Sequence, residues 1–271
     1  MRPQSQKAAD FRTLHEGDPF IIPNPWDAGS AKVLAALGFM ALATTSSGFA
    51  FTLGRTDGGV SLDEVAGHVR LLDEATALPV SVDLENGYGP APEDAARAIE
   101  RAAEAGAVGG SIEDYDPDGR IYDRDHGVER VAAAAEAAGR LGFPFTLTAR
   151  AENHIRGNPD LDDTIGRLHA YARAGADVLY APGLTGEDDI RRVVEAVAPL
   201  PVNVLAFAGA PDVARLAALG VKRISVGGAF AFAAIDAVAE AARELREDGT
   251  YGFLERARNG SELARRAFDE R

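Results

Sequence analysis

The stretch PVNVLAFAGAPDVARLAALGVKRISVGG, residues 201–228, contains the pattern that decides the fold. Its apolar runs at 202–206 and 223–227 predict two strands, and the alanine-rich segment 210–219 between them predicts a helix. Gly220 lies where this helix must end and turn into the next strand. Because both runs are almost entirely apolar, they are typical of parallel strands that are covered on both faces.

The same strand-then-helix alternation repeats eight times over about 230 residues and predicts an α/β fold, a (β/α)8 TIM barrel. A doubly wound open sheet is the main rival, but NPWDAGSA after the first strand is not the G-x-G-x-x-G fingerprint typical of that fold. We expect one domain over residues 1–271, in which 248–271 form a C-terminal helical extension. The predicted strands are 20–24, 40–45, 79–83, 109–114, 145–150, 178–182, 202–206 and 223–227, and the predicted helices are 28–37, 61–76, 91–105, 127–140, 160–174, 186–197, 210–219 and 229–247.

The bulk composition narrows the class of protein. The chain has no cysteine, which excludes disulfides, zinc-thiolate sites and a cysteine nucleophile. A formal net charge of −14 disfavours binding to nucleic acid or to an anionic membrane surface. No apolar run approaches the ~20 residues that cross a bilayer, and the N-terminus lacks the apolar core of a secretory signal. We therefore expect a soluble, acidic, cytoplasmic protein.

Carboxylates follow two neighbouring strands of the predicted barrel. Asp83 and Glu85 end the strand in PVSVDLENGYG, residues 79–89, and Glu113 ends the next strand. The carboxyl ends of barrel strands open on one face, so these three side chains should converge and repel one another. A Mg2+ ion, which prefers oxygen ligands, would offset that repulsion. Arg150 ends the following strand and would hold a substrate carboxylate, or else pair with these acids and close the barrel rim.

A second candidate lies in TTSSGF, residues 44–49, where small residues follow a strand. Exposed backbone N–H groups and hydroxyls there would form a carboxylate cradle, although an ordinary polar turn has the same composition. The three lysines, Lys7, Lys32 and Lys222, do not end a strand on the active face, which argues against a Schiff-base aldolase. Residues 225–228 lie where many barrels bind phosphate, although their glycines would also serve close packing.

Several stretches together resemble the isocitrate lyase/phosphoenolpyruvate mutase superfamily. They occur in the family's order over residues 20–228 and read NPWDAGSAKVLAALGF, TTSSGFAFTLGRTDGG, PVSVDLENGYG, GGSIED, TARAEN and PVNVLAFAGAPDVARLAALGVKRISVGG. The resemblance implies a barrel whose last helix is exchanged between subunits of a dimer of dimers. It also implies Mg2+ or Mn2+ as cofactor and a small carboxylic acid as substrate.

The same resemblance implies roles for individual residues. The metal would be held by Asp83, Glu85 and Glu113, partly through water. Ser47, Gly48 and Phe49 match the carboxylate cradle. The remaining residues that fall on family site positions are Trp26, Asp57, Arg150 and Asn203. We expect Trp26 and Asn203 to contact substrate, Arg150 to bind it and take part in catalysis, and Asp57 to orient a water or a loop group.

The chain departs from the family in the segment EDYDPDGRIYDRDHGVERV, residues 113–131. Family lyases carry a lysine, a cysteine and a histidine there, and this segment has neither the cysteine nor the lysine. The chain therefore resembles a divergent member of this family, one without the lyase cysteine loop. Tyr122 and His126 remain as candidates for proton transfer, unless this is simply a solvated loop.

These observations lead to one function and two alternatives. We expect a Mg2+-dependent lyase-type enzyme that cleaves or forms a C–C bond, or a C–P bond, next to an enolate of a small 2-oxo or 2-hydroxy acid. A metal and an arginine around the developing oxyanion suit that chemistry. The runner-up is a metal-assisted hydrolase or decarboxylase of an oxaloacetate-like acid, in which water replaces the thiol. The other alternative is a carboxylate-binding barrel without catalysis.

Overall fold

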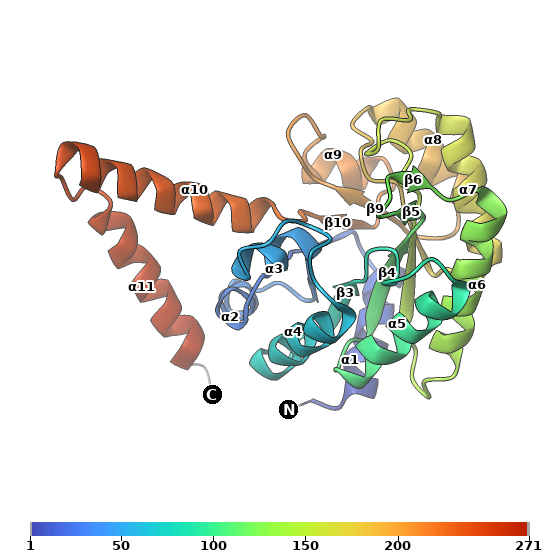
Figure 1. The fold of residues 1–271 in the computed structure, drawn as a ribbon, viewed down its shortest axis with the longest axis horizontal. Helices are drawn as coiled ribbons and strands as arrows, with labels where there is room; N and C mark the ends of the chain where they lie inside the picture. Colours follow the sequence, from blue (N-terminus) through green and yellow to red (C-terminus); the bar gives the residue numbers. More distant parts are fainter. Residues whose placement is uncertain (1, 270–271) are drawn as a thin grey trace.

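The computed structural model describes residues 2–269 and confirms the barrel. Eight parallel strands form one sheet in the order β1-β10-β9-β8-β7-β4-β3-β2 (Figure 1). Ala43 N donates a hydrogen bond of 3.0 Å to Pro23 O, which joins the two end strands and nearly closes the ring. The strands are β1 (Phe20–Ile22), β2 (Leu42–Ala43), β3 (Val80–Asp83), β4 (Gly109–Glu113), β7 (Thr146–Arg150), β8 (Val178–Tyr180), β9 (Val202–Leu205) and β10 (Arg223–Ser225).

All eight predicted helices are present, and each begins within three residues of its predicted start. Local signals define several ends: Ser61 and Glu64 form a reciprocal capping box, and Pro92 begins α5 as predicted. The main apolar core lies between the strands and their covering helices, where Leu147 and Leu168 are buried. The helices are α2 (Ala28–Ala36), α4 (Leu62–Ala75), α5 (Pro92–Glu104), α6 (Arg124–Gly139), α7 (Leu161–Arg173), α8 (Glu187–Val197), α9 (Val213–Ala218) and α10 (Ala229–Arg243).

Three short elements were not predicted. These are helix α1 (Gln4–Glu16), helix α3 (Ser46–Thr52) and the hairpin of β5 (Tyr115–Asp116) and β6 (Arg120–Ile121). Polar as well as apolar contacts hold α1: the Lys7 ammonium is buried and lies 2.8 Å from an Asp73 carboxylate oxygen, and Ala8 and Phe11 pack in a small apolar cluster with Phe20 and Ile22. A periodicity search does not detect such a helix.

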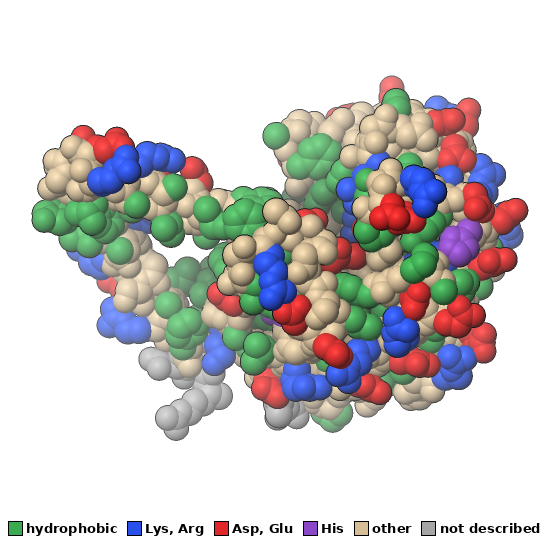
Figure 2. Space-filling view, in the orientation of Figure 1, with side chains coloured by type: hydrophobic (Ala, Val, Ile, Leu, Met, Phe, Trp, Pro, Cys, Tyr) green, Lys and Arg blue, Asp and Glu red, His purple; other side chains and the backbone are tan. Residues whose placement is uncertain are grey.

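Helix α10 and the C-terminal extension that follows it form an arm, residues 229–269, that projects from the barrel (Figure 1). After α10, a π-helical turn (Glu244–Asp248) leads into α11 (Leu254–Asp269), which packs on α2 of the same chain. Exchange of the last helix between subunits remains a prediction. No helix in residues 2–269 has the length and apolarity needed to span a bilayer. Figure 2 shows hydrophobic side chains gathered along the arm; the exposed ones include Phe230, Phe232, Ile235, Val238, Leu245, Tyr251, Leu254, Leu263 and Phe268.

Candidate active site

A cavity of about 170 Å³ opens at the carboxyl ends of the barrel strands. It contains two arginines, Arg150 from β7 and Arg223 from β10, on walls formed by different strands. Its volume equals the share of roughly six liquid waters, which suits a small organic acid. The predicted residues that line it are Ser47, Asp57, Asp83, Arg150 and Asn203.

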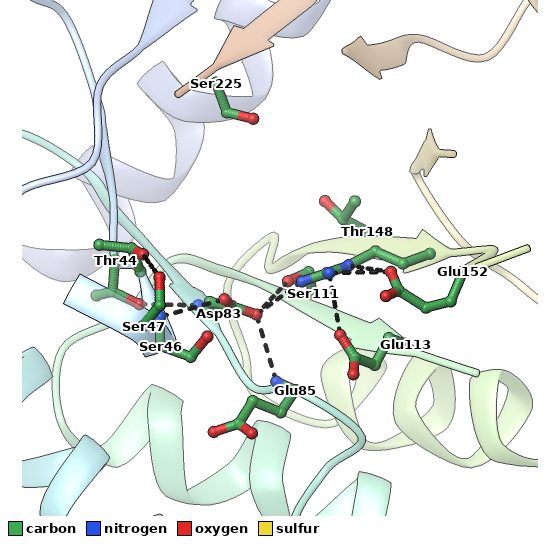
Figure 3. Close-up of polar contacts among 12 residues, drawn as sticks. Thr44, Ser46, Ser47, Asp83, Glu85, Ser111, Glu113, Thr148, Glu152 and Ser225 are labelled. Atoms are coloured by element: carbon green, nitrogen blue, oxygen red, sulfur yellow. Dashed lines mark hydrogen bonds and ion pairs between the residues drawn. The ribbon is translucent and has the colours of Figure 1, made fainter. Parts of the chain in front are cut away.

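Arg150 lies among three carboxylates of the acidic wall, those of Asp83, Glu113 and Glu152, which Figure 3 labels. Its Nη1 lies 3.0 Å from Asp83 Oδ1, and its Nη2 lies 3.0 Å from Glu113 Oε2. Its Nε and Nη2 both reach Glu152 Oε1, at 3.0 and 2.9 Å. The predicted convergence of Asp83 and Glu113 is therefore present, and the guanidinium of Arg150 lies between them.

These contacts decide the charge state of Arg150. Burial alone would lower its pKa, but Glu152, Glu113 and Asp83 together raise the pKa well above its usual value. Glu152 is fully buried, and its other oxygen accepts from Arg156 Nε at 3.2 Å. Nε and Nη1 donate hydrogen bonds to Glu152 and Asp83, and Nη2 forms ion pairs with Glu113 and Glu152, so Arg150 is an oriented, permanently charged group whose charge these acids already match.

Glu85 lies in a strained turn at the mouth of the site. Its φ is +48° and that of Tyr88 is +61°, in the left-handed region that such residues rarely adopt. Its side chain lines an outer cavity of about 320 Å³ together with Asp57 and Glu113. Burial, followed by the charges of Asp83 and Asp57, raises the pKa of Glu85 to about 7. The rim therefore carries more negative charge than its arginines offset.

The predicted carboxylate cradle is partly engaged within the protein. Gly48 N donates to Thr45 Oγ1 at 3.3 Å, and Phe49 N donates to Thr45 O at 3.0 Å, so both amides serve the first turn of α3. The Phe49 ring stacks on His68 with centroids 3.9 Å apart. Ser47 lines the cavity, whereas Gly48, Phe49 and Trp26 lie behind its wall.

The two candidates for proton transfer lie away from both cavities. The Tyr122 hydroxyl accepts from Asn86 Nδ2 at 3.3 Å, and His126 Nε2 lies 2.8 Å from Pro90 O. The buried Arg130 donates to three carbonyl oxygens of the same turn, those of Asn86, Gly89 and Ala91. Together these side chains hold the backbone that follows Glu85, so their contacts here indicate a positioning role.

The wall opposite Arg150 is polar, and it is built around Arg223. Asn203 Nδ2 donates to Ser225 Oγ at 3.0 Å, and Asn203 Oδ1 accepts from Arg223 Nε at 2.8 Å. Asn24 Oδ1 accepts from the backbone N–H groups of Val226 and Gly227, both at 2.9 Å. These bonds fix the end of β10 beside the cavity.

Sequence reasoning missed two charged residues here, Arg156 and Arg223, and it placed Glu152 after the fifth strand without giving it a role. Glu152 lies two residues after Arg150, the predicted end of a strand, and this position at the carboxyl end of the barrel is the signal that could have assigned it to the site. Arg223 begins an apolar strand, and its sequence RIS puts it on the same face as Ser225, which is two residues later. An arginine on the inward face of a barrel strand needs a polar partner, and this requirement would have revealed it.

The donor set fits a hard divalent cation. Asp57, Asp83, Glu85 and Glu113 offer only carboxylate oxygens, and the raised pKa of Glu85 indicates negative charge that a cation would offset. Over residues 2–269 no three such side chains form a ready metal cage. Mg2+ usually keeps several waters and binds one or two carboxylates directly, so this open arrangement fits an ion held partly through water.

The model of the phosphoenolpyruvate phosphomutase family matches residues 11–246. The chain belongs to this family. An uncharacterized protein of Mycobacterium tuberculosis is 32% identical to this family member over 86% of the chain and 87% of the relative. The 2-methylisocitrate lyase of Escherichia coli is 29% identical over 88% and 83%, respectively. An oxaloacetate decarboxylase of Bradyrhizobium is 30% identical over 87% and 84%.

The chain is also similar to solved structures. A Burkholderia cenocepacia protein, provisionally classed as a lyase/mutase, is 55% identical with a TM-score of 0.93, over 97% of this chain and 95% of that one. Oxaloacetate acetylhydrolase in complex with its product oxalate is 27% identical with a TM-score of 0.85, over 93% and 90%. The resemblance to the phosphoenolpyruvate mutase/isocitrate lyase superfamily is thus confirmed.

Proposed function

We propose that this chain is a Mg2+-dependent (or Mn2+-dependent) lyase-type enzyme that cleaves or forms a C–C bond in a small 2-oxo or 2-hydroxy acid through an enolate. The alternative bond within the same chemistry is C–P. The observation that carries the proposal is the buried Arg150, held by three carboxylates at the edge of a small cavity. The relatives named as a lyase, a decarboxylase and an acetylhydrolase support this class of reaction.

The residues that line the cavity would have different roles in binding the substrate and in catalysis. The hydroxyl of Ser47 faces the cavity and would donate to a substrate carboxylate. Cleavage leaves negative charge on an oxygen, and Arg150 would stabilise part of that charge through the guanidinium hydrogens that its carboxylate partners leave free. Asn203, whose amide is fixed by Ser225 and Arg223, would bound the substrate on the other side.

Asp83, Glu85 and Glu113, with Asp57 nearby, would hold the metal ion at the mouth of this cavity. When bound, the ion would supply a Lewis acid for the substrate oxygens. The protein contributes the oxygen donors and keeps Asp83 in place through Arg150 and through Ser46 N, which donates to Asp83 Oδ2 at 3.3 Å.

A decarboxylase of an oxaloacetate-like acid is the second candidate. Loss of CO2 leaves an enolate that water can protonate, so the step requires no acid from the protein. The chain has no cysteine, and neither Tyr122 nor His126 lines the cavities, which favours a reaction of this kind over a retro-aldol cleavage.

Calorimetric titration with oxalate tests the metal-dependent site. We expect Mg2+ to raise the oxalate affinity of the wild type at least about tenfold, which corresponds to ~1.4 kcal/mol. Asp83→Ala should abolish this gain, whereas the exposed control Asp188→Ala should keep it. Oxalate binding that is unchanged without metal would contradict the proposal. Turnover of any 2-oxo or 2-hydroxy acid that disappears in Glu113→Gln would exclude a barrel that only binds.

We also propose that the arm carries the contact between subunits of a homo-oligomer, with a dimer of dimers as the expected form. The exposed apolar residues of α10, including Phe232, Ile235 and Val238, support this proposal because such side chains are normally covered. Light scattering on Val238→Asp should show a smaller particle than the wild type. A monomeric wild type would contradict the proposal.

A further inference from the structure

Arg223 lies inside the barrel, and the groups that hold it are uncharged. Its Nε donates to Asn203 Oδ1 at 2.8 Å and its Nη2 donates to Thr148 Oγ1 at 2.9 Å. Its Nη1 lies 3.3 Å from His15 Nε2. His15 Nδ1 lies 2.8 Å from the carbonyl oxygen of Phe11, so the ring can donate there and accept from Arg223. His15 is neutral, because burial and then the charge of Arg223 lower its pKa to about 3.

The charge of Arg223 is therefore not balanced locally. The residue is 5% exposed, and no carboxylate in residues 2–269 forms an ion pair with it or raises its pKa, which burial lowers to about 10. Buried charges in proteins are normally paired, since an isolated one loses its hydration without compensation. Three of its five N–H groups have partners, which leaves two without one.

The two arginines of the cavity differ in what they can offer a ligand. The charge of Arg150 is matched by Asp83, Glu113 and Glu152, whereas Arg223 lines the same 170 Å³ cavity with no ion-pair partner in residues 2–269. An anionic ligand that enters the cavity would therefore gain more from Arg223. A carboxylate that meets this guanidinium forms charge-assisted hydrogen bonds, which are stronger than neutral ones.

We propose that Arg223 is an anion subsite at the inner end of the cavity, and that it receives the second carboxylate of a dicarboxylic substrate. This inference rests on the proposed function, which puts the 2-oxo or 2-hydroxy acid end beside Ser47 and Arg150. The cavity suits a four-carbon diacid in size, and Thr148 and Asn203 fix the guanidinium that meets its far end. The subsite thus selects dicarboxylates over monocarboxylates of equal length.

A matched pair of ligands tests the subsite. Malate and 2-hydroxybutyrate share the 2-hydroxy acid end, but malate ends in a carboxylate and 2-hydroxybutyrate in a methyl group. Calorimetry with Mg2+ present should show that the wild type prefers malate by about tenfold to a hundredfold, as expected for a hydrogen-bonded charge. Arg223→Met should remove this preference and leave the affinities for 2-hydroxybutyrate and oxalate unchanged, and Arg223→Lys should retain part of it.

The outcomes separate this inference from the function on which it rests. A wild type that binds both acids equally, or that fails to bind malate, overturns the subsite, and this measurement needs no variant to fold. A malate preference that persists in Arg223→Met overturns it as well. If malate is preferred through Arg223 but oxalate binds regardless of Mg2+, the subsite stands and the metal-dependent function fails.

Discussion

Arg150 and Arg223 line one cavity, yet Arg150 faces three carboxylates and Arg223 faces an amide, a hydroxyl and a neutral imidazole. The positive charge of Arg150 holds the protein's own carboxylates in place. The positive charge of Arg223 stays available inside the barrel. The difference teaches that exposure and charge alone do not identify a ligand-binding arginine, because its existing partners decide what it can still bind.

The largest expected loss of stability follows the removal of Arg150, and the removal of Arg223 is the comparison. Arg150→Met leaves Asp83, Glu113 and Glu152 buried without their shared cation, which should cost about 3–5 kcal/mol of unfolding free energy. Arg223→Met leaves only neutral groups beside a cavity that water can enter, so we expect a change of about 1 kcal/mol or less. Urea unfolding of the two variants measures both values. Equal losses would show that the charge of Arg223 is balanced by groups that the contacts do not reveal.

This contrast also bears on what the sequence could predict. The strands, their order and the acids at Asp83 and Glu113 follow from local patterns, because a parallel strand and its carboxyl end are encoded within a few residues. The partners are not local: Arg150 meets Asp83 from a strand 67 residues further along the chain, and Arg223 meets His15 across 208 residues. Several charged side chains lie near one another inside the barrel, and their lengths and directions decide which of them pair. The pattern of residues along the chain does not predict these pairs.

Helix α1 is a second feature that the sequence did not predict, and it lies at the other end of the barrel. Lys7, Ala8, Phe11 and His15 are buried on it, and because two of these four side chains are polar, the segment has no clear apolar stripe. Tyr122 and His126 are predicted from their chemistry, but their contacts with the turn of residues 86–91, to the Asn86 side chain and the Pro90 carbonyl oxygen, do not follow from the sequence.

A second expected effect is a pH dependence of the free energy of unfolding, which comes from Glu85 in the acidic wall. The pKa of Glu85 is about 7 in the folded protein, above its ordinary value of 4.5, so the unfolded chain loses this proton first as pH rises. The free energy of unfolding should therefore fall between about pH 4.5 and pH 7, by at most about 3 kcal/mol from this group. Urea unfolding in the presence of a chelator, at about pH 5 and about pH 7.5, measures the fall.

Two comparisons attribute this fall to Glu85 and to its charged neighbours. Glu85→Gln should remove its share of the pH dependence, because the amide does not titrate. Saturating Mg2+ should restore stability more at the higher pH, where the carboxylate is ionised and can bind the ion. A wild type whose stability is flat or rises with pH over this window would show that Glu85 is not crowded by Asp83 and Asp57.

The smallest expected effect is that of Tyr122→Phe, behind the acidic wall. Phenylalanine keeps the ring, which lies 4.8 Å from the Arg130 guanidinium, and loses only the hydroxyl that accepts from Asn86 at 3.3 Å. We expect less than about 1 kcal/mol of lost stability and a kcat within about threefold of wild type, whereas loss of a general acid costs about 10²–10⁴-fold. A fall of that larger size, with oxalate binding intact, would mean that Tyr122 reaches the substrate and that the turn after Glu85 rearranges to admit it.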